Sequence, residues 1–325
     1  AIKIDGKIEP YDDKRLMPQD TEQMIRDIYT IAKKDDIEDF IHNGDDDFSF
    51  SIPQVGRFRV NAYRQRNSFA AVLRIVSFLL PDPKIMHIPS IVIDLAKQMN
   101  GMVLVSGPAG SGKSTTLACI IDQINNSRNS HIITIEDPIE YLHTHKQSIV
   151  SQREVYHDTK DYVSALRAAL REAPEVILVG EMRDLETIEI SVTAAETGHL
   201  VFSSLHTIGA ANTIDRMIDV FPATQQQQIR VQLSMVLNGV VSQQLLPGKD
   251  GKMLPVFEIM LCNQAIRNLI REGKTHQMQN TITANRASGM ITMDDAIIEA
   301  YKQDKITKET AIMYASDARY VASKM

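Results

Sequence analysis

The fold class of this chain follows from one segment, Met102-Val-Leu-Val-Ser-Gly107-Pro-Ala-Gly-Ser-Gly112-Lys113-Ser114. Its second part matches the pattern G-x-x-x-x-G-K-[ST] of a phosphate-binding loop, or P-loop, placed between an apolar strand and a helix. The backbone N–H groups of such a loop surround phosphates, and the positive end of the following helix points at them. We expect Lys113 to reach the β- and γ-phosphates of a nucleotide and Ser114 to bind Mg²⁺. The sequence therefore predicts a nucleotide-binding α/β domain.

The alternation of strand and helix continues after the loop. Apolar runs follow at residues 132–135, 176–179 and 200–202, and helical patterns lie between them at 162–171 and 185–196. Continuous apolar runs are typical of strands that are buried on both faces of a parallel sheet. The alternation predicts a doubly wound α/β domain over residues 90–325. From about Ala223 onward the pattern is mostly helical, so we expect a helical C-terminal region.

Carboxylates follow two of the predicted strands. Glu136, Asp137 and Glu140 follow one apolar run, and Glu181 follows another. Like charges beside a phosphate site are costly unless a cation such as Mg²⁺ neutralises them. Glu181 is therefore a candidate metal ligand, and Glu140 is a candidate to orient or deprotonate the attacking water. Alternatively, Glu181 faces solvent at a strand end and the other three form an acidic surface loop.

Two histidines, His199 and His206, flank the apolar strand that contains residues 200–202. A histidine beside an apolar strand is usually a core or rim residue. As a pair close to the motifs above, they also fit a sensor role, in which each donates a hydrogen bond to the γ-phosphate and loses it after hydrolysis.

Residues 1–80 have a different pattern, which predicts a small α+β domain. Segments 2–8, 48–52 and 57–63 alternate as strands do, and residues 20–32 have apolar side chains at helical spacing. The segment 53–56 is a hairpin-like connection between two of these strands. Prolines stiffen residues 81–89, which we interpret as a linker.

Charge and composition restrict the classes of function. The net charge is −6, which argues against a protein that mainly binds nucleic acid. Only two cysteines occur, too few for a disulfide framework, and this favours a reducing cytoplasm. No leader sequence is recognisable, and no apolar run approaches the roughly 18 residues that a transmembrane helix needs.

In this order the motifs resemble those of the type II/IV secretion ATPase superfamily. Its Walker A loop corresponds to residues 107–114, its Asp box to 136–140, its Walker B strand to 176–181 and its His box to 199–206. Within the superfamily the chain is most similar to the PilT family, which powers retraction of type IV pili. The similarity covers nearly the whole chain and extends to residues 151–154, 165–172, 180–186, 213–222 and 265–272.

The resemblance implies a homohexameric ATPase ring that uses ATP and Mg²⁺. Each subunit would join a PAS-like N-terminal domain, here expected to lack its first strand and helix and to have a short loop at 33–44, to a RecA-like domain. The ring would lie in the cytoplasm, at the inner face of the cytoplasmic membrane, and act on a pilus platform protein there. The nucleotide-binding residues would be Gly107, Pro108, Ala109, Gly110, Ser111, Gly112, Lys113, Ser114, Thr115, Glu136 and Asp137.

The resemblance also implies roles in catalysis. Glu140 would be the general base, and Glu181 would serve the metal and the water. Arginines at the positions of Arg57, Arg59 and Arg74 reach the nucleotide in this family, so these three join Lys113, His199 and His206 as catalytic candidates.

The sequence also leaves other functions open. A pilus-assembly or secretion-export ATPase of the same superfamily usually carries a four-cysteine metal insertion, which this chain lacks. A DNA translocase is disfavoured by the acidic charge, and a catalytically inactive ring is disfavoured by the intact motifs. In the predicted helix at 265–272, Arg267 and Arg271 lie on the polar face, where they are candidates to serve retraction; alternatively, the helix is an amphipathic core helix with a structural role only.

Overall fold

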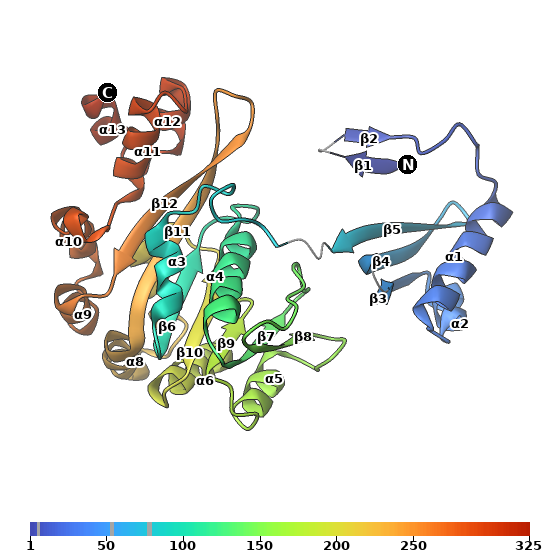
Figure 1. The fold of residues 1–325 in the computed structure, drawn as a ribbon, viewed down its shortest axis with the longest axis horizontal. Helices are drawn as coiled ribbons and strands as arrows, with labels where there is room; N and C mark the ends of the chain where they lie inside the picture. Colours follow the sequence, from blue (N-terminus) through green and yellow to red (C-terminus); the bar gives the residue numbers. More distant parts are fainter. Residues whose placement is uncertain (5–6, 53–54, 77–79) are drawn as a thin grey trace. The chain divides into compact units, whose positions relative to one another are not determined.

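The computed structural model describes residues 1–325 except 5–6, 53–54 and 77–79. It divides into two compact units, residues 1–78 and 79–325 (Figure 1). Part of the hairpin-like connection expected at 53–56 therefore lies outside the described residues. Residues 81–89, interpreted from sequence as a linker, group with the second unit, where the side chain of Ile88 is buried.

The first unit contains an antiparallel three-stranded sheet packed against two helices. Its aromatic core joins the two layers, because the ring of Tyr29 lies 5.9 Å from that of Phe40 and 4.8 Å from that of Phe48. The segment at 33–44, expected to be a short loop, contains a helix. The elements are β1 Ile2–Ile4, β2 Lys7–Glu9, α1 Pro18–Ala32, α2 Ile37–Asn43, β3 Asp45–Ile52, β4 Gly56–Gln65 and β5 Ser68–Val76.

The sheet of the first unit has one apolar face and one polar face. Val60 and Ala62 of β4 are buried in the core shared with α1 and α2. Arg59 alternates with these residues and lies directly opposite Arg74 of β5 in the register, so both arginines belong to the other face. Arg57 lies two residues from Arg59 and shares that face. The three candidate arginines are therefore grouped together.

In the second unit, seven of the described strands form one sheet, in the order β12-β11-β6-β10-β9-β7-β8. All neighbouring pairs are parallel except β11 and β12. The strands are β6 Gly101–Ser106, β7 His131–Glu136, β8 Ile149–Glu154, β9 Val176–Val179, β10 Leu200–Leu205, β11 Leu237–Pro247 and β12 Met253–Leu261.

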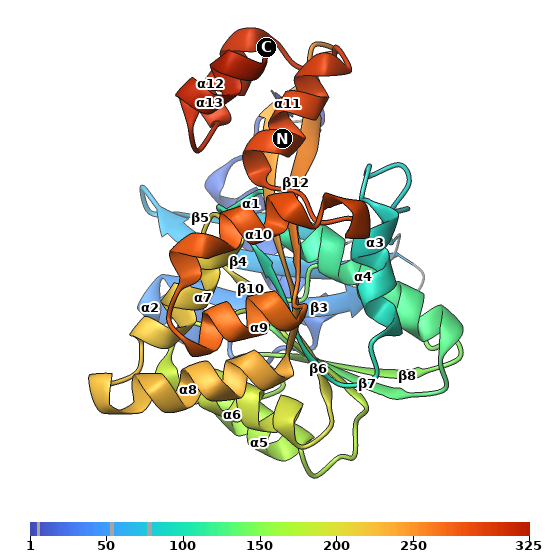
Figure 2. The ribbon, with the colours of Figure 1, turned by 90° about the vertical axis from the view of Figure 1, so that its left-hand side faces the viewer.

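Helices cover both faces of this sheet (Figure 2). Met102 and Leu104 of β6 pack on the side of α5, α6 and α8, whereas Val103 and Val105 pack on the side of α3 and α4. This double burial explains why the strand is a continuous apolar run. The helices of the unit are α3 Ser90–Ile93, α4 Lys113–Ser127, α5 Tyr162–Ala169, α6 Leu185–Glu196, α7 Ala210–Asp219, α8 Ala223–Val236, α9 Gln264–Arg271, α10 Met278–Ala284, α11 Met293–Lys302, α12 Lys308–Tyr314 and α13 Ala318–Lys324.

The expectation of a mostly helical region from about Ala223 is wrong for residues 237–261. These residues form β11 and β12, which extend the central sheet before the chain becomes helical again. The polar residues Ser242, Gln243 and Gln244 interrupt the apolar pattern of β11 although all three are buried. They hide the strand from sequence reasoning.

The last three helices form a small core of their own on the β11–β12 hairpin. Leu246 and Val256 of the hairpin pack with Ile297 of α11 and Val321 of α13. None of the described helices combines the length and apolar character needed to cross a membrane.

Candidate nucleotide site

The candidate site lies where four parallel strands end. β6, β10, β9 and β7 are neighbours in the sheet and run in the same direction, so their carboxyl ends meet at one edge. β6 leads into the P-loop, β10 into His206, β9 into Glu181, and β7 into the loop that carries Glu140. Side chains from all four segments line one cavity of about 280 Å³. The geometry thus unites motifs that are up to a hundred residues apart in sequence.

The P-loop packs against β11, and this contact explains two of its glycines. A Cβ atom at Gly107 would lie 2.1 Å from the backbone oxygen of Gln243, and one at Gly112 would lie 2.8 Å from Nε2 of the same residue. Gly112 also has a φ of 90°, which favours glycine. Thr116 of α4 donates a hydrogen bond of 2.7 Å to Oε1 of Gln243. Gln243 is therefore a buried support of the loop, and sequence reasoning missed it.

Lys113 lies inside the curve of the P-loop. Its Nζ donates hydrogen bonds of 2.9 Å to the carbonyl oxygens of Gly107 and Pro108. Burial lowers the pKa of Lys113 below its usual value, although the carboxylates of Glu140 and Glu181 act in the opposite direction. An ammonium group held in this way is placed to interact with an anion in the loop.

Glu181 and His206 are paired. Oε2 of Glu181 lies 3.2 Å from Nε2 of His206, and Oε1 of Glu181 lies 2.8 Å from Nε of Arg183. The side chain of Glu181 is only 14% exposed, whereas that of His206 is 50% exposed. Two partners therefore hold this carboxylate at the cavity.

The acidic loop after β7 forms another wall of the cavity. Oε1 of Glu136 accepts hydrogen bonds from Thr134 Oγ1 at 2.6 Å and from Gln152 Nε2 at 3.2 Å. Burial nevertheless raises the pKa of Glu136 to about 7. Tyr141 joins the loop to the P-loop helix, because its hydroxyl lies 2.8 Å from Thr115 Oγ1. Glu140 is exposed at the rim of this wall.

Not every candidate residue comes to this cavity. His199 precedes β10, at the amino end of the strand, whereas His206 follows its carboxyl end. Nδ1 of His199 lies 2.9 Å from the carbonyl oxygen of Ala194, at the end of α6. The structure therefore separates the two histidines by the length of the strand. Arg57, Arg59 and Arg74 belong to the first unit.

The donor set of the cavity fits Mg²⁺ that arrives with a nucleotide. Ser114 and Glu181 both line the cavity, and each offers the oxygen ligand that this ion prefers. The described part of the chain contains no cluster of three or more metal-ligating His, Cys, Asp or Glu residues. Mg²⁺ usually binds through one or two protein oxygens together with phosphates and water, so such a cluster is not required.

A second cavity, of about 840 Å³, begins at the same helix. It shares Gly112, Thr115 and Thr116 with the P-loop region and extends to Leu245 of β11 and to residues 85–88. Its size suits a bound group of nucleoside dimensions.

A comparison of the sequence with protein-family models matches residues 90–311 to the family described as type II/IV secretion system protein. The chain belongs to this family. The match begins at α3 and ends in α12, so it contains every strand of the central sheet.

Individual relatives place the chain among the PilT proteins of the family. The type IV pilus retraction ATPase PilT of Pseudomonas aeruginosa is 44% identical over 95% of this chain and 89% of its own length. A twitching motility protein of Neisseria gonorrhoeae is 50% identical over 82% of this chain and 71% of its own length. This chain is a PilT-family ATPase.

Solved structures show the same fold. The crystal structure of the pilus retraction motor PilT with bound ADP has a TM-score of 0.91 and 47% identity, and it covers 99% of this chain and 91% of its own. The ATPase DotB of Legionella pneumophila has a TM-score of 0.76 and 26% identity, over 93% of this chain and 85% of its own. The fold of the second unit is therefore that of a RecA-like, secretion-family ATPase.

Proposed function

We propose that this ATPase hydrolyses Mg²⁺-bound ATP to retract type IV pili and so drives twitching motility. One observation carries the proposal: Lys113, the Glu181–His206 pair and the loop of Glu140 line a single cavity at one edge of the sheet. The names of the relatives from Pseudomonas and Neisseria support the cellular role, since they describe pilus retraction and twitching motility.

The residues of the cavity divide the chemistry between them. Backbone N–H groups of residues 109–115 bind the phosphates, and Lys113 exchanges its carbonyl partners for phosphate oxygens. Glu140 orients the attacking water and accepts its proton, which is the role of a general base. Glu136 and Asp137 complete the acidic wall beside the nucleotide. In phosphoryl transfer such positioning and electrostatic effects supply nearly all of the catalysis.

Ser114 and Glu181 would hold the metal ion. When bound, Mg²⁺ neutralises negative charge on the phosphates and stabilises the charge that develops during transfer. His206, whose ring lies 3.2 Å from Glu181, would be the sensor that donates a hydrogen bond to the γ-phosphate and loses it after hydrolysis. The larger cavity beside Thr115 and Thr116 would take the base and ribose.

We further propose a homohexamer in which the first unit, residues 1–80, is the PAS-like domain. Arg57, Arg59 and Arg74 would reach a nucleotide, as an arginine finger does. Residues 81–89 would act as a hinge between two arrangements of the domains, one favoured by bound ATP and the other by bound ADP. Moving such an equilibrium from about 1:99 to 99:1 requires roughly 5.5 kcal/mol of differential binding. Charge-assisted bonds to the γ-phosphate could contribute part of it.

The proposed setting is the cytoplasm, at the inner face of the cytoplasmic membrane. There the ring would act on a platform protein of the pilus machinery. Direct contact with nucleic acid is not expected, and DNA-stimulated ATP hydrolysis would favour a translocase instead.

A substitution of Lys113 tests the site. Lys113→Ala removes the ammonium group that the P-loop encloses, so we expect ATP turnover to fall by at least about 10²-fold, the cost of removing one strong electrostatic donor. Lys97→Ala is the matched control, because Lys97 is an exposed lysine of the same unit. Full activity of Lys113→Ala would show that the catalytic site lies elsewhere.

Cells test the biological role. Cells that lack this protein, or carry only its Glu181→Ala variant, should be hyperpiliated and unable to twitch, because pili would form but not retract. Restoring the wild-type protein should restore twitching. Cells without pili would indicate an assembly or export ATPase of the same family.

A further inference from the structure

The edge strand β8 carries polar residues that the proposed chemistry does not use. It ends in Ser151-Gln152-Arg153-Glu154, one of the stretches that resemble the PilT family. Gln152 and Glu154 are two residues apart, so their side chains leave the strand on the same face. Glu154 is almost fully buried, at 2% exposure. A buried carboxylate beside an ATPase cavity requires a physical explanation.

Both side chains hold the backbone of the loop that carries Glu140. Oε2 of Glu154 accepts a hydrogen bond of 3.1 Å from the N–H of Ile139, the residue before Glu140. Nε2 of Gln152 donates a hydrogen bond of 2.9 Å to the carbonyl oxygen of Tyr141, the residue after it. The chain is thus fixed on both sides of Glu140.

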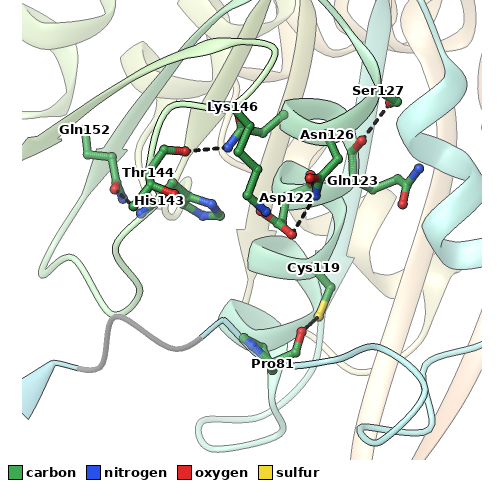
Figure 3. Close-up of polar contacts among 11 residues, drawn as sticks. Pro81, Cys119, Asp122, Gln123, Asn126, Ser127, His143, Thr144, Lys146 and Gln152 are labelled. Carbon is green, nitrogen blue, oxygen red and sulfur yellow. Dashed lines mark hydrogen bonds and ion pairs between the residues drawn. The ribbon is translucent and has the colours of Figure 1, made fainter.

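Gln152 makes two further contacts with the same wall of the cavity. Its Oε1 accepts a hydrogen bond of 2.7 Å from the N–H of His143, and its Nε2 also donates to Glu136. One amide therefore binds a donor and an acceptor of the loop backbone and joins them to the acidic residue at the end of β7. Figure 3 shows Gln152 beside His143.

The far end of the loop is attached to the P-loop helix α4. The buried amide of Asn125 donates to the carbonyl oxygen of Thr144 at 2.8 Å and accepts from the N–H of Lys146 at 3.2 Å. Nζ of Lys146 forms an ion pair of 2.6 Å with Asp122, and Figure 3 shows the two residues together. The loop is therefore held between β8 and the helix that begins at Lys113.

The carboxylate of Glu140 itself makes no hydrogen bond with any described residue. Its side chain is exposed at the cavity, and the neighbouring backbone alone sets where it can reach. Catalytic groups need placement within fractions of an ångström, and an error of about 1 Å can cost about 10²-fold in rate. Whatever fixes residues 139 and 141 therefore also determines the placement of Glu140.

We propose that Gln152 and Glu154 are positioning residues that place Glu140 for attack on the nucleotide. This inference rests on the proposed role of Glu140 as general base. The two side chains act through the backbone and do not touch the substrate. Strand β8 is then part of the catalytic apparatus as well as the edge of the sheet.

The Gln152→Met variant tests this proposal, because it keeps the length of the side chain and removes all of its hydrogen bonds. We expect kcat for ATP to fall about 10- to 100-fold, while the dissociation constant for ADP stays within about twofold, since the P-loop is untouched. Arg153→Ala is the matched control, because Arg153 points to the other face and makes a partly exposed ion pair of 3.5 Å with Glu172. It should keep wild-type kcat.

Glu154 supplies an independent pair of variants. Glu154→Gln retains an oxygen that can accept from Ile139, so its kcat should stay within about threefold of wild type. Glu154→Leu removes the acceptor and should lose about as much activity as Gln152→Met. Thermal unfolding of each variant identifies any loss of fold. A folded Gln152→Met protein with wild-type kcat, or equal losses in Glu154→Gln and Glu154→Leu, would overturn the proposal.

A double-mutant cycle with Glu140→Gln separates this inference from the function it rests on. If Gln152 acts through Glu140, adding Gln152→Met to the slow Glu140→Gln enzyme should lower kcat no further. The same loss in both backgrounds would show that Gln152 acts independently of Glu140 and would overturn the inference alone. Wild-type kcat in Glu140→Gln would instead refute the general-base role.

Discussion

At the scale of single residues, Glu136 shows how burial and hydrogen bonding compete over one carboxyl group. Burial raises its pKa, and the hydrogen bonds from Thr134 and Gln152 oppose that shift without cancelling it. The resulting pKa of about 7 lies well above the ordinary glutamate value, so the group takes up its proton near neutral pH. Its ionisation is therefore coupled to the stability of the fold.

The sign of this coupling gives a prediction. Between about pH 4.5 and pH 7 the folded protein binds a proton at Glu136 that the unfolded chain does not bind, so the free energy of unfolding should fall as pH rises through this range. The slope from one proton is at most about 1.4 kcal/mol per pH unit. Glu136→Gln should remove this component, as measured by denaturant unfolding between pH 4.5 and 8 without nucleotide or Mg²⁺. Glu186→Gln is the control, because it replaces an exposed carboxyl group and should leave the pH dependence of the free energy of unfolding unchanged. If Glu136→Gln also leaves that pH dependence unchanged, the prediction is wrong.

Single residues also show what sequence could and could not reveal about the site. Lys113 and Glu181 follow from local motifs, because a strand end and its loop are continuous in the chain. Gln243 supports the P-loop helix from a strand that is distant in sequence, and no local pattern marks it. Gln152 lies only 11 residues after Tyr141, in a stretch that resembles the PilT family, but the sequence gives no sign of its contacts. His199 and His206 look equivalent in sequence, but opposite ends of a strand lie at opposite edges of a sheet. Only one of them can join the P-loop of the same subunit.

At the scale of elements, the polar face of α9 already makes contacts within the protein, with the end of α8. Nη1 of Arg267 donates hydrogen bonds of 2.7 Å to the carbonyl oxygens of Ser234 and Met235, at the C-terminal end of α8. Those carbonyls belong to the last turn of a helix, where they have no partner within the helix, and a cation there is stabilising. Arg271 makes a longer contact of 3.4 Å with the hydroxyl of Ser234. The two arginines of this helix therefore differ in their contacts with α8.

We expect Arg267→Met to destabilise the fold by about 1–3 kcal/mol, because it removes two charge-assisted hydrogen bonds from the end of α8. Arg271→Met should cost less, and thermal unfolding would rank the two. If Arg271 serves retraction, its substitution should abolish pilus retraction and leave most of the ATPase activity. Equal loss of retraction and ATP hydrolysis in Arg271→Met would assign the helix a structural role only.

Whether a strand could be predicted from the sequence depends on how its two faces are buried. Strands β6, β7, β9 and β10 were predicted because both of their faces are covered and their sequences are continuous apolar runs. β8 lies at the edge of the sheet and ends in polar residues, and β11 contains buried polar residues, so neither has that signature. Among these polar residues, Gln243 supports the P-loop helix, and Gln152 and Glu154 hold the loop of Glu140.

At the scale of the whole molecule, the three arginines of the first unit are the residues to test. Arg59 and Arg74 face each other across two strands, on the face of the sheet opposite the apolar core. Paired arginines without a core function are suited to an anionic ligand. Their proposed target is the triphosphate of an assembled ring.

The Arg59→Ala/Arg74→Ala double variant should lose at least about 10³-fold in kcat, which is the scale of a missing arginine finger. Arg64→Ala is the control, because Arg64 lies on the other face of β4, over the ring of Phe69. If the arginines act on a neighbouring subunit, mixing the double variant with Lys113→Ala should restore ATP hydrolysis that neither has alone. A fully active double variant would exclude both arginines from catalysis.

The contact of Gln243 with Gly107 and Gly112 has a consequence for sequence variation. A strand more than a hundred residues downstream forms the floor of the phosphate loop. The backbone oxygen of residue 243 excludes a side chain at Gly107 whatever amino acid stands at 243, whereas the side-chain amide of Gln243 lies against Gly112. A side chain at Gly107 or Gly112 would collide with this floor. A shorter side chain at 243 would leave the hydroxyl of Thr116 without its hydrogen-bond acceptor. Among homologues we therefore expect glycine at 107 whatever residue stands at 243, whereas Gly112, Thr116 and Gln243 should be retained together or replaced together.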